Sequence, residues 1–146
     1  MLRSAAIAIV LLAALTAPAA RAQNAQGNLI IELNNLAPQG AVMLQLFNSE
    51  PGYANGDAVH VGRVAVIGDT ATIRFDGLTP GQYAFRLFHD LNGDGRMNTN
   101  PFGIPTEPFA FSNNARGSFG PARWADAAFT LNAGANTQAI SVEGMN

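Results

Sequence analysis

The chain of 146 residues contains no cysteine and no lysine. The absence of cysteine excludes disulfide bonds, thiol nucleophiles and thiolate ligands for a metal. The absence of lysine excludes enzymes that work through a lysine Schiff base. Packing, hydrogen bonds or bound ions must therefore stabilise the fold.

Basic residues are few and scattered along the sequence. All eight are arginine, against ten acidic residues. They form no run and no basic stripe, so a nucleic-acid partner is not expected. Arg3 and Arg21 lie in the first 22 residues, so the rest of the chain is more acidic than the whole.

A longer apolar run occurs only near the N-terminus, at residues 5–15, after Arg3. Such a run is long enough for a signal peptide and too short to cross a bilayer. Ala-Arg-Ala at 20–22 fits the small-x-small cleavage rule, which predicts a signal peptide over residues 1–22. No cysteine stands at the cleavage point, which argues against a lipoprotein anchor. We expect a periplasmic or secreted protein with one domain, residues 23–146, and no transmembrane segment after cleavage.

The rest of the chain alternates apolar and polar residues in short segments separated by turn residues. Such alternation is typical of strands with one face in a core. Seven strands are expected, at residues 28–36, 41–48, 59–66, 70–75, 82–89, 127–132 and 137–143. Their spacing predicts an all-β fold, an antiparallel β-sandwich of about seven strands. A shift of the apolar phase near Gly62 predicts a bulge, and Ile67-Gly68-Asp69 predicts a tight hairpin.

Residues 90–126 break this rhythm, because they contain no clear strand. Loops of this length in a small domain are usually functional or disordered. This one carries aromatic residues, which disordered segments generally lack; they are Phe102, Phe109, Phe111, Phe119 and Trp124. We expect one long ordered loop, packed across one end of the sandwich. A shorter polar loop is expected at residues 49–58.

The long loop begins with half of a calcium-binding motif. Asp90, Asn92 and Asp94 place a side-chain oxygen at every second position, and Gly95 follows where the chain must turn. The complete candidate metal site consists of Asp90, Asn92, Asp94, the backbone carbonyl of Arg96, and Asn98 acting through a water. The cofactor would be Ca²⁺, bound weakly because few of these ligands are charged.

The second half of that motif is missing. The twelfth position, where a bidentate glutamate is expected, holds Pro101. Glu107 or Asp126 would have to supply the missing carboxylate from elsewhere in the loop. The alternative is a run of turns in which Asn and Asp side chains bond the backbone without an ion. The sequence leaves both interpretations open.

His89 and Glu107 form a second candidate site. His89 ends the most strongly patterned strand, where a general base or a metal ligand would stand at the mouth of the site. The alternative, which we favour, is a partly buried histidine whose ring nitrogens bond to the long loop, for example to Glu107. One histidine without a nucleophile motif is weak evidence for catalysis.

Three polar residues, Asn113, Asn114 and Arg116, lie between Phe111 and Phe119. Amides and one arginine beside aromatic rings are groups that bind a sugar or a carboxylate. The alternative is that the asparagines bond loop backbone groups that would otherwise be buried without a partner. For a long packed loop, the second interpretation is the stronger.

Several segments of the chain match the sequence pattern of a known family. Residues 75–90 read FDGLTPGQYAFRLFHD and resemble a strand pair of the DUF2141 family of exported bacterial proteins. NGDG at 92–95 and GIPTEPFAFSNNARG at 103–117 resemble its turn and its middle block, except that Ala110 replaces the usual glycine. The resemblance implies a prealbumin-like or immunoglobulin-like sandwich. It implies no reaction, substrate or ligand.

These features together predict an exported, non-catalytic binding or accessory module. Its long loop would be the binding surface, ordered by Ca²⁺, and its partner a small molecule, a glycan or a protein. Two alternatives are a small periplasmic hydrolase using His89 and Glu107, and a purely structural envelope protein whose loop only caps the sandwich. Exposed aromatic side chains around a groove would favour binding, and buried ones would favour capping.

Overall fold

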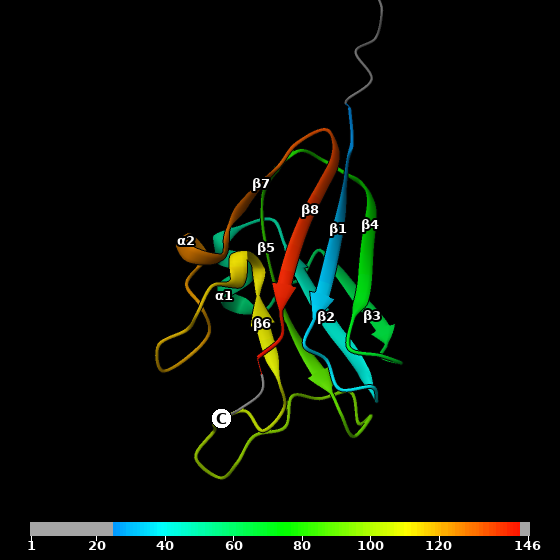
Figure 1. Ribbon diagram of the computed structural model, residues 1–146. Helices are drawn as coiled ribbons and strands as arrows, with labels where there is room; N and C mark the ends of the chain where they lie inside the picture. Colours follow the sequence, from blue (N-terminus) through cyan, green and yellow to red (C-terminus); the bar gives the residue numbers. More distant parts are fainter. Residues whose placement is uncertain (1–24, 144–146) are drawn as a thin grey trace, which may run out of the picture.

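The computed structural model describes residues 25–143, which form two β-sheets packed against each other (Figure 1). The predicted signal peptide and its cleavage point lie outside these residues. One sheet has the strand order β4-β1-β8; the other has five strands, in the order β3-β2-β5-β6 with β7 also paired to β5. The strands are β1 (Gly27–Asn34), β2 (Ala41–Phe47), β3 (His60–Ala65), β4 (Ala71–Leu78), β5 (Gly81–Asp90), β6 (Phe109–Phe111), β7 (Phe129–Leu131) and β8 (Gly134–Ser141). The predicted all-β sandwich is confirmed.

Each of the seven predicted strands corresponds to a strand of the structure, and β6 is additional. It lies inside the segment expected as one long loop and pairs with β5 in the register Leu87↔Ala110. A strand of three residues is too short to show a period of two, which is why the pattern did not reveal it.

One strand pair departs from the antiparallel pattern. β8 runs parallel to β1, in register from Gly27↔Gly134 to Asn34↔Ser141. The chain enters β8 from β7, which belongs to the other sheet, so no tight turn forces β8 to run against its neighbour. The other pairs of named strands are antiparallel.

Two predictions of local geometry are wrong. Ile67-Gly68-Asp69 does not form a hairpin between paired strands, because β3 and β4 belong to different sheets. The segment between them crosses from one sheet to the other instead. There is also no bulge at Gly62, since the register of β2 with β3 is continuous from Ala41↔Ala65 to Leu46↔His60. Gly62 leaves room for Ile73 and Phe75 of the facing sheet, so the apolar phase shifts without a bulge.

The structure has two apolar cores, and β5 contributes to both. Its inner face places Phe85 and Leu87 between the sheets, where Phe85 is fully buried. Its outer face places Ala84 in a smaller cluster with Phe47 and Phe111. Burial of a phenylalanine such as Phe85 contributes roughly 1.5–3 kcal/mol to stability. Burial on both faces fits the central position of β5 in its sheet.

A short helix, α1 (Glu50–Asn55), occupies most of the segment expected as a polar loop. The Ser49 hydroxyl caps its first turn by accepting the N–H of Gly52 at 3.2 Å. Gly56, in the left-handed region at φ 81°, ends it. The serine and the glycine are both helix-boundary signals, but a helix of six residues shows too little apolar periodicity to be recognised.

Tyr53 joins this helix to the second one, α2 (Trp124–Ala127). The buried Tyr53 hydroxyl donates to the carbonyl of Ala122 at 2.8 Å. Its ring meets Phe47 and Trp124 edge to face, with centroids 5.2 and 5.9 Å away. Burial raises the pKa of the Tyr53 phenol, and the nearby positive charge of Arg86 opposes that shift. The two helices therefore cover part of the outer face of the five-stranded sheet as one unit.

The segment 90–126 is ordered, but it is not a single loop. It contains β6, a 3-10 turn η1 (Ser112–Asn114) and α2. Residues 91–108 lie at the end of the sandwich where β5 finishes, as predicted, whereas α2 and η1 lie farther along the sheet (Figure 1). Within residues 25–143, no helix is long and apolar enough to span a membrane.

Candidate functional site

Asp90, the last residue of β5, organises the start of the long segment. It is 2% exposed. Its Oδ1 accepts the N–H of Gly93 at 2.8 Å, and its Oδ2 accepts the N–H of Gly95 at 2.9 Å. Each carboxylate oxygen therefore holds one backbone group of the turn, which is the arrangement expected of a polar turn.

Asn92, Asp94 and Asn98 converge at the exposed side of this turn. The Asp94 Oδ1 accepts the N–H of Arg96, and its Oδ2 accepts Asn98 Nδ2, both at 2.9 Å. Asn92 Nδ2 donates to Asn98 Oδ1, also at 2.9 Å. The hydrogen bond from Asn98, followed by that from the Arg96 backbone, holds the pKa of Asp94 below its ordinary value. The Asp94 carboxylate thus stays ionised and accessible to water.

Glu107 is the distant carboxylate that the fold brings to the loop. It is buried, and its two oxygens accept the N–H groups of Leu91 at 3.0 Å and Asn98 at 3.1 Å. Asp126, the other candidate, instead pairs with Arg123 at 2.8 Å. This pairing lowers the pKa of the Asp126 carboxyl through the hydrogen bond from Arg123. Within the described residues, no three His, Asp or Glu side chains form a metal-binding group.

His89 is 1% exposed and points into the core between the sheets. Its Nε2 lies 2.7 Å from the carbonyl oxygen of Gln39, in the connection between β1 and β2. Its Nδ1 has no hydrogen-bond partner in the described part of the chain. The expected ring contact with Glu107 is therefore wrong. Sequence spacing could not show that the loop before β2 lies beside the end of β5.

The side chains of the Ser-Asn-Asn turn η1 bond backbone groups of β5, of the end of α2 and of β8. Ser112, which the sequence reasoning missed, is fully buried; its hydroxyl donates to the carbonyl of Ala127 at 2.7 Å and accepts the N–H of Phe85 at 3.0 Å. Asn113, at φ 60°, donates through Nδ2 to the carbonyl of Ala128 at 2.9 Å. A polar residue directly after the Phe-Ala-Phe segment was the available signal for Ser112.

Asn114 binds the free edge of β8. Its Nδ2 donates to the carbonyl of Ala139 at 3.0 Å, and its Oδ1 accepts the N–H of Ser141 at 2.9 Å. The side-chain amide thus forms the same pair of bonds that a neighbouring strand would form. Both asparagines predicted as ligand-binding residues have amides that hold backbone.

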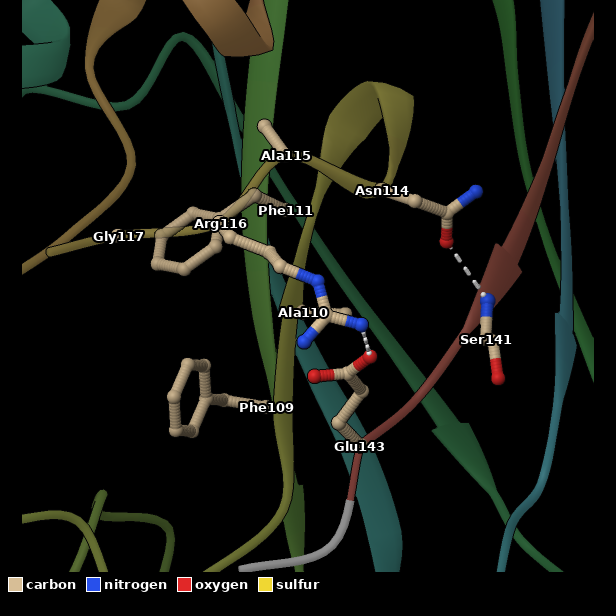
Figure 2. A pocket seen from close by; sticks show the side chains of 9 residues that line it. All are labelled: Phe109, Ala110, Phe111, Asn114, Ala115, Arg116, Gly117, Ser141 and Glu143. Carbon is tan, nitrogen blue, oxygen red and sulfur yellow. Dashed lines mark hydrogen bonds and ion pairs between the residues drawn. The ribbon is translucent and has the colours of Figure 1, made fainter.

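Asn113, Asn114 and Arg116 are all exposed, and Arg116 is the one whose side chain bonds another side chain and no backbone group of the described residues. It forms an ion pair with Glu143 over a shallow pocket of about 160 Å³, beside Phe109 and Phe111 (Figure 2). The two phenylalanine rings meet edge to face at 5.8 Å. Both charged side chains are more than half exposed, so their pairing contributes little to stability. A bound carboxylate could take the place of Glu143 on Arg116 at small cost.

The aromatic residues of the segment divide between packing and exposure. Phe111 is buried, and Phe109 and Trp124 are half-buried. Phe102 is 88% exposed, and Phe119 is fully exposed at a positive φ of 59°. A bulky residue in that region is a backbone outlier. The segment therefore both caps the fold and presents aromatic surface.

No curated protein and no solved structure matches the chain. One family model does match, over residues 23–139, and it describes uncharacterized proteins conserved in bacteria, DUF2141. The match spans the whole region from β1 to most of β8, including every candidate residue discussed above except Glu143. The chain therefore belongs to the DUF2141 family.

Proposed function

We propose that the protein is an exported, non-catalytic binding module whose ligand site is the pocket between Arg116 and Glu143. The pocket is the observation that carries this proposal: an accessible guanidinium lies beside two aromatic rings of the edge strand β6. Export is supported by the signal-like residues 1–22. The non-catalytic part is supported by His89 and Glu107, whose bonds are to backbone groups.

A carboxylated sugar is the ligand class that fits these groups best. The planar fork of Arg116 matches a carboxylate, and the ring of Phe109 offers an apolar face to a sugar. We expect glucuronic acid to shift the backbone NMR signals of Arg116 and Phe109 in a saturable way, with a dissociation constant on the order of 1 mM. The expected weakening for Arg116→Gln is about tenfold.

Two controls test whether binding depends on Arg116 and on the carboxylate of the sugar. Arg74→Gln also removes one positive charge, but on β4, where Arg74 pairs with Asp76. This variant should leave the titration unchanged. Glucose has no carboxylate and should produce little shift. Equal shifts with glucose, or binding that survives in Arg116→Gln, would contradict the proposal and leave the purely structural envelope protein as the better interpretation.

We also propose that Ca²⁺ orders the turn at Asp90–Asn98. Asp94 remains ionised, and the side chains of Asn92 and Asn98 lie within hydrogen-bond reach of one another or of Asp94. Asp90, Asp94 and Glu107 form no metal-binding group among the described residues, so Ca²⁺ would have to draw their carboxylates together. The carboxylate oxygens of Asp90 and Glu107 each accept one backbone N–H and have a second lone pair free for a cation. These are the hard oxygen ligands that Ca²⁺ prefers.

Calcium should therefore raise the melting temperature. With a dissociation constant near 1 mM, as in weak extracellular sites, about 10 mM Ca²⁺ should add roughly 1.4 kcal/mol of stability, or roughly 3–6 °C. Asp94→Asn should abolish the shift, whereas Asp76→Asn, on β4, should retain it. Calorimetry measures the melting temperature, and a sample with Mg²⁺ at equal ionic strength is the reference. An unchanged melting temperature in the unmodified protein would rule out the ion.

A further inference from the structure

The outer face of the five-stranded sheet is only half covered. α1 and α2 pack over Phe47, Ala84 and Phe111, and the rows beyond them stay within reach of solvent. Strand register places Arg63, Met43, Phe88 and Phe109 directly opposite one another, in one row across four strands. The adjacent row continues the surface with Val61, Gln45 and Arg86. None of these seven residues is buried, and Val61 is 73% exposed.

The two arginines of this surface lack acidic partners. The three ion pairs among residues 25–143 involve other arginines. The one acidic residue at an outward position of β2, β3, β5 or β6 is Asp90, and both of its oxygens already accept backbone N–H groups. Glu50 and Asp57, at the two ends of α1, form no ion pair with Arg63 or Arg86 either, so these two rows present positive charge on a chain that is acidic overall.

Arg86 is also held in place. Its Nε donates to Gln45 Oε1 at 2.8 Å, and its guanidinium carbon lies 5.0 Å from the centre of the Phe47 ring. Its Nη2 lies beside Gly56 at the end of α1, and neither terminal nitrogen donates a hydrogen bond to the described part of the chain. A guanidinium that is already ordered, with free donors, loses less side-chain entropy when it binds an anion.

The residue types on this face match those of protein interfaces. Arginine, methionine and aromatic residues are enriched at interfaces, and aspartate, glutamate and lysine are depleted. Met43 adds an adaptable apolar side chain. A second copy of the chain does not fit, because two such faces would oppose arginine to arginine without a carboxylate between them. The surface needs an occupant with acidic groups.

We propose that this face binds a segment of a different protein that carries both carboxylates and apolar side chains. Its carboxylates pair with Arg63 and Arg86, and its apolar side chains lie on Met43 and Phe88. The surface is separate from the pocket at Arg116, although Phe109 borders both. Failure of the sugar titration would therefore not contradict peptide binding at this face. Failure of peptide binding would likewise not contradict the sugar site at Arg116.

The test is selection of random dodecapeptides, displayed on phage, against the purified full chain. We expect the enriched peptides to contain an excess of Asp and Glu together with Leu, Ile or Phe. Synthetic copies should bind at least tenfold more weakly to the double variant Arg63→Gln with Arg86→Gln. Arg74→Gln is the matched control and should bind as the unmodified protein does. Because Arg86→Gln removes a packing contact, the exposed Arg63→Gln alone is the second variant, with an expected loss of about threefold.

Several results would overturn the proposal. These are no enrichment, enriched peptides without an excess of acids, and peptide binding that is equal in the double variant. NMR shifts that map to Arg116 rather than to Met43 and Phe88 would also overturn it. So would binding to phosphatidylglycerol vesicles in place of peptides, or a dimer in light scattering that Arg63→Gln dissociates, since those results identify a membrane or a second copy as the occupant.

Discussion

An alanine at Gly40 should lower the free energy of unfolding by roughly 3 kcal/mol or more. Gly40 precedes β2 and lies in the left-handed region at φ 67°. A Cβ at this position would overlap the backbone carbonyl oxygen of Asp90, which cannot rotate away as a side chain can. The alanine variant must therefore separate the start of β2 from the end of β5. Urea denaturation followed by circular dichroism measures the loss.

Gly93→Ala is the control for this change. Gly93 also has a positive φ, of 78°, but nothing lies within 4 Å of the position of its Cβ. Only the backbone strain of an L-residue should appear there, at about 1–2 kcal/mol. The difference between the two variants measures the close approach of Gly40 to Asp90. Equal losses of unfolding free energy in the two variants would show that the close approach of Gly40 to Asp90 does not affect stability.

Asp90→Asn should lower the free energy of unfolding by about 2–4 kcal/mol. The substitution keeps one acceptor and places the amide NH₂ of a buried side chain against a backbone N–H of the turn, so a donor faces a donor. It also removes the charge that strengthens both hydrogen bonds. Denaturation at neutral pH measures this effect, and the amide signals of Gly93 and Gly95 should move upfield as their bonds weaken.

Asp76→Asn provides the exposed counterpart. Asp76 is 62% exposed and, among residues 25–143, forms an ion pair with Arg74 alone, so the loss of stability should be below about 1 kcal/mol. A similar loss for both variants would show that the two backbone bonds of Asp90 do not anchor the turn. Glu107→Gln extends the comparison, since Glu107 holds the same turn through Leu91 and Asn98.

The sequence predicted the strands well because alternation is a local property. Leu29, Ile31 and Leu33 show on their own which face of β1 is buried. Alternation shows which face of a strand is buried but not which strand lies beside it, because each strand shows the pattern by itself. The parallel pairing of β1 with β8 and the crossing between β3 and β4 therefore could not be read from the sequence.

The candidate site was predictable in composition but not in contacts. The spacing of Asp90, Asn92 and Asp94 identified a polar turn, because local side-chain-to-backbone bonds depend on spacing alone. It could not separate an ion site from a turn without an ion, since both use the same oxygens. The contact of Glu107 with the turn and that of His89 with Gln39 are tertiary, and spacing along the chain does not encode them.

The amide of Asn114 has a consequence for how the protein behaves at high concentration. An uncovered edge strand invites a strand from another molecule, which leads to aggregates or exchanged domains. Along Ala139 to Ser141 an incoming strand would first have to displace Asn114, whose two bonds already saturate that stretch of β8. One uncharged side chain thus protects this edge of the three-stranded sheet in a protein that has no lysine for the purpose.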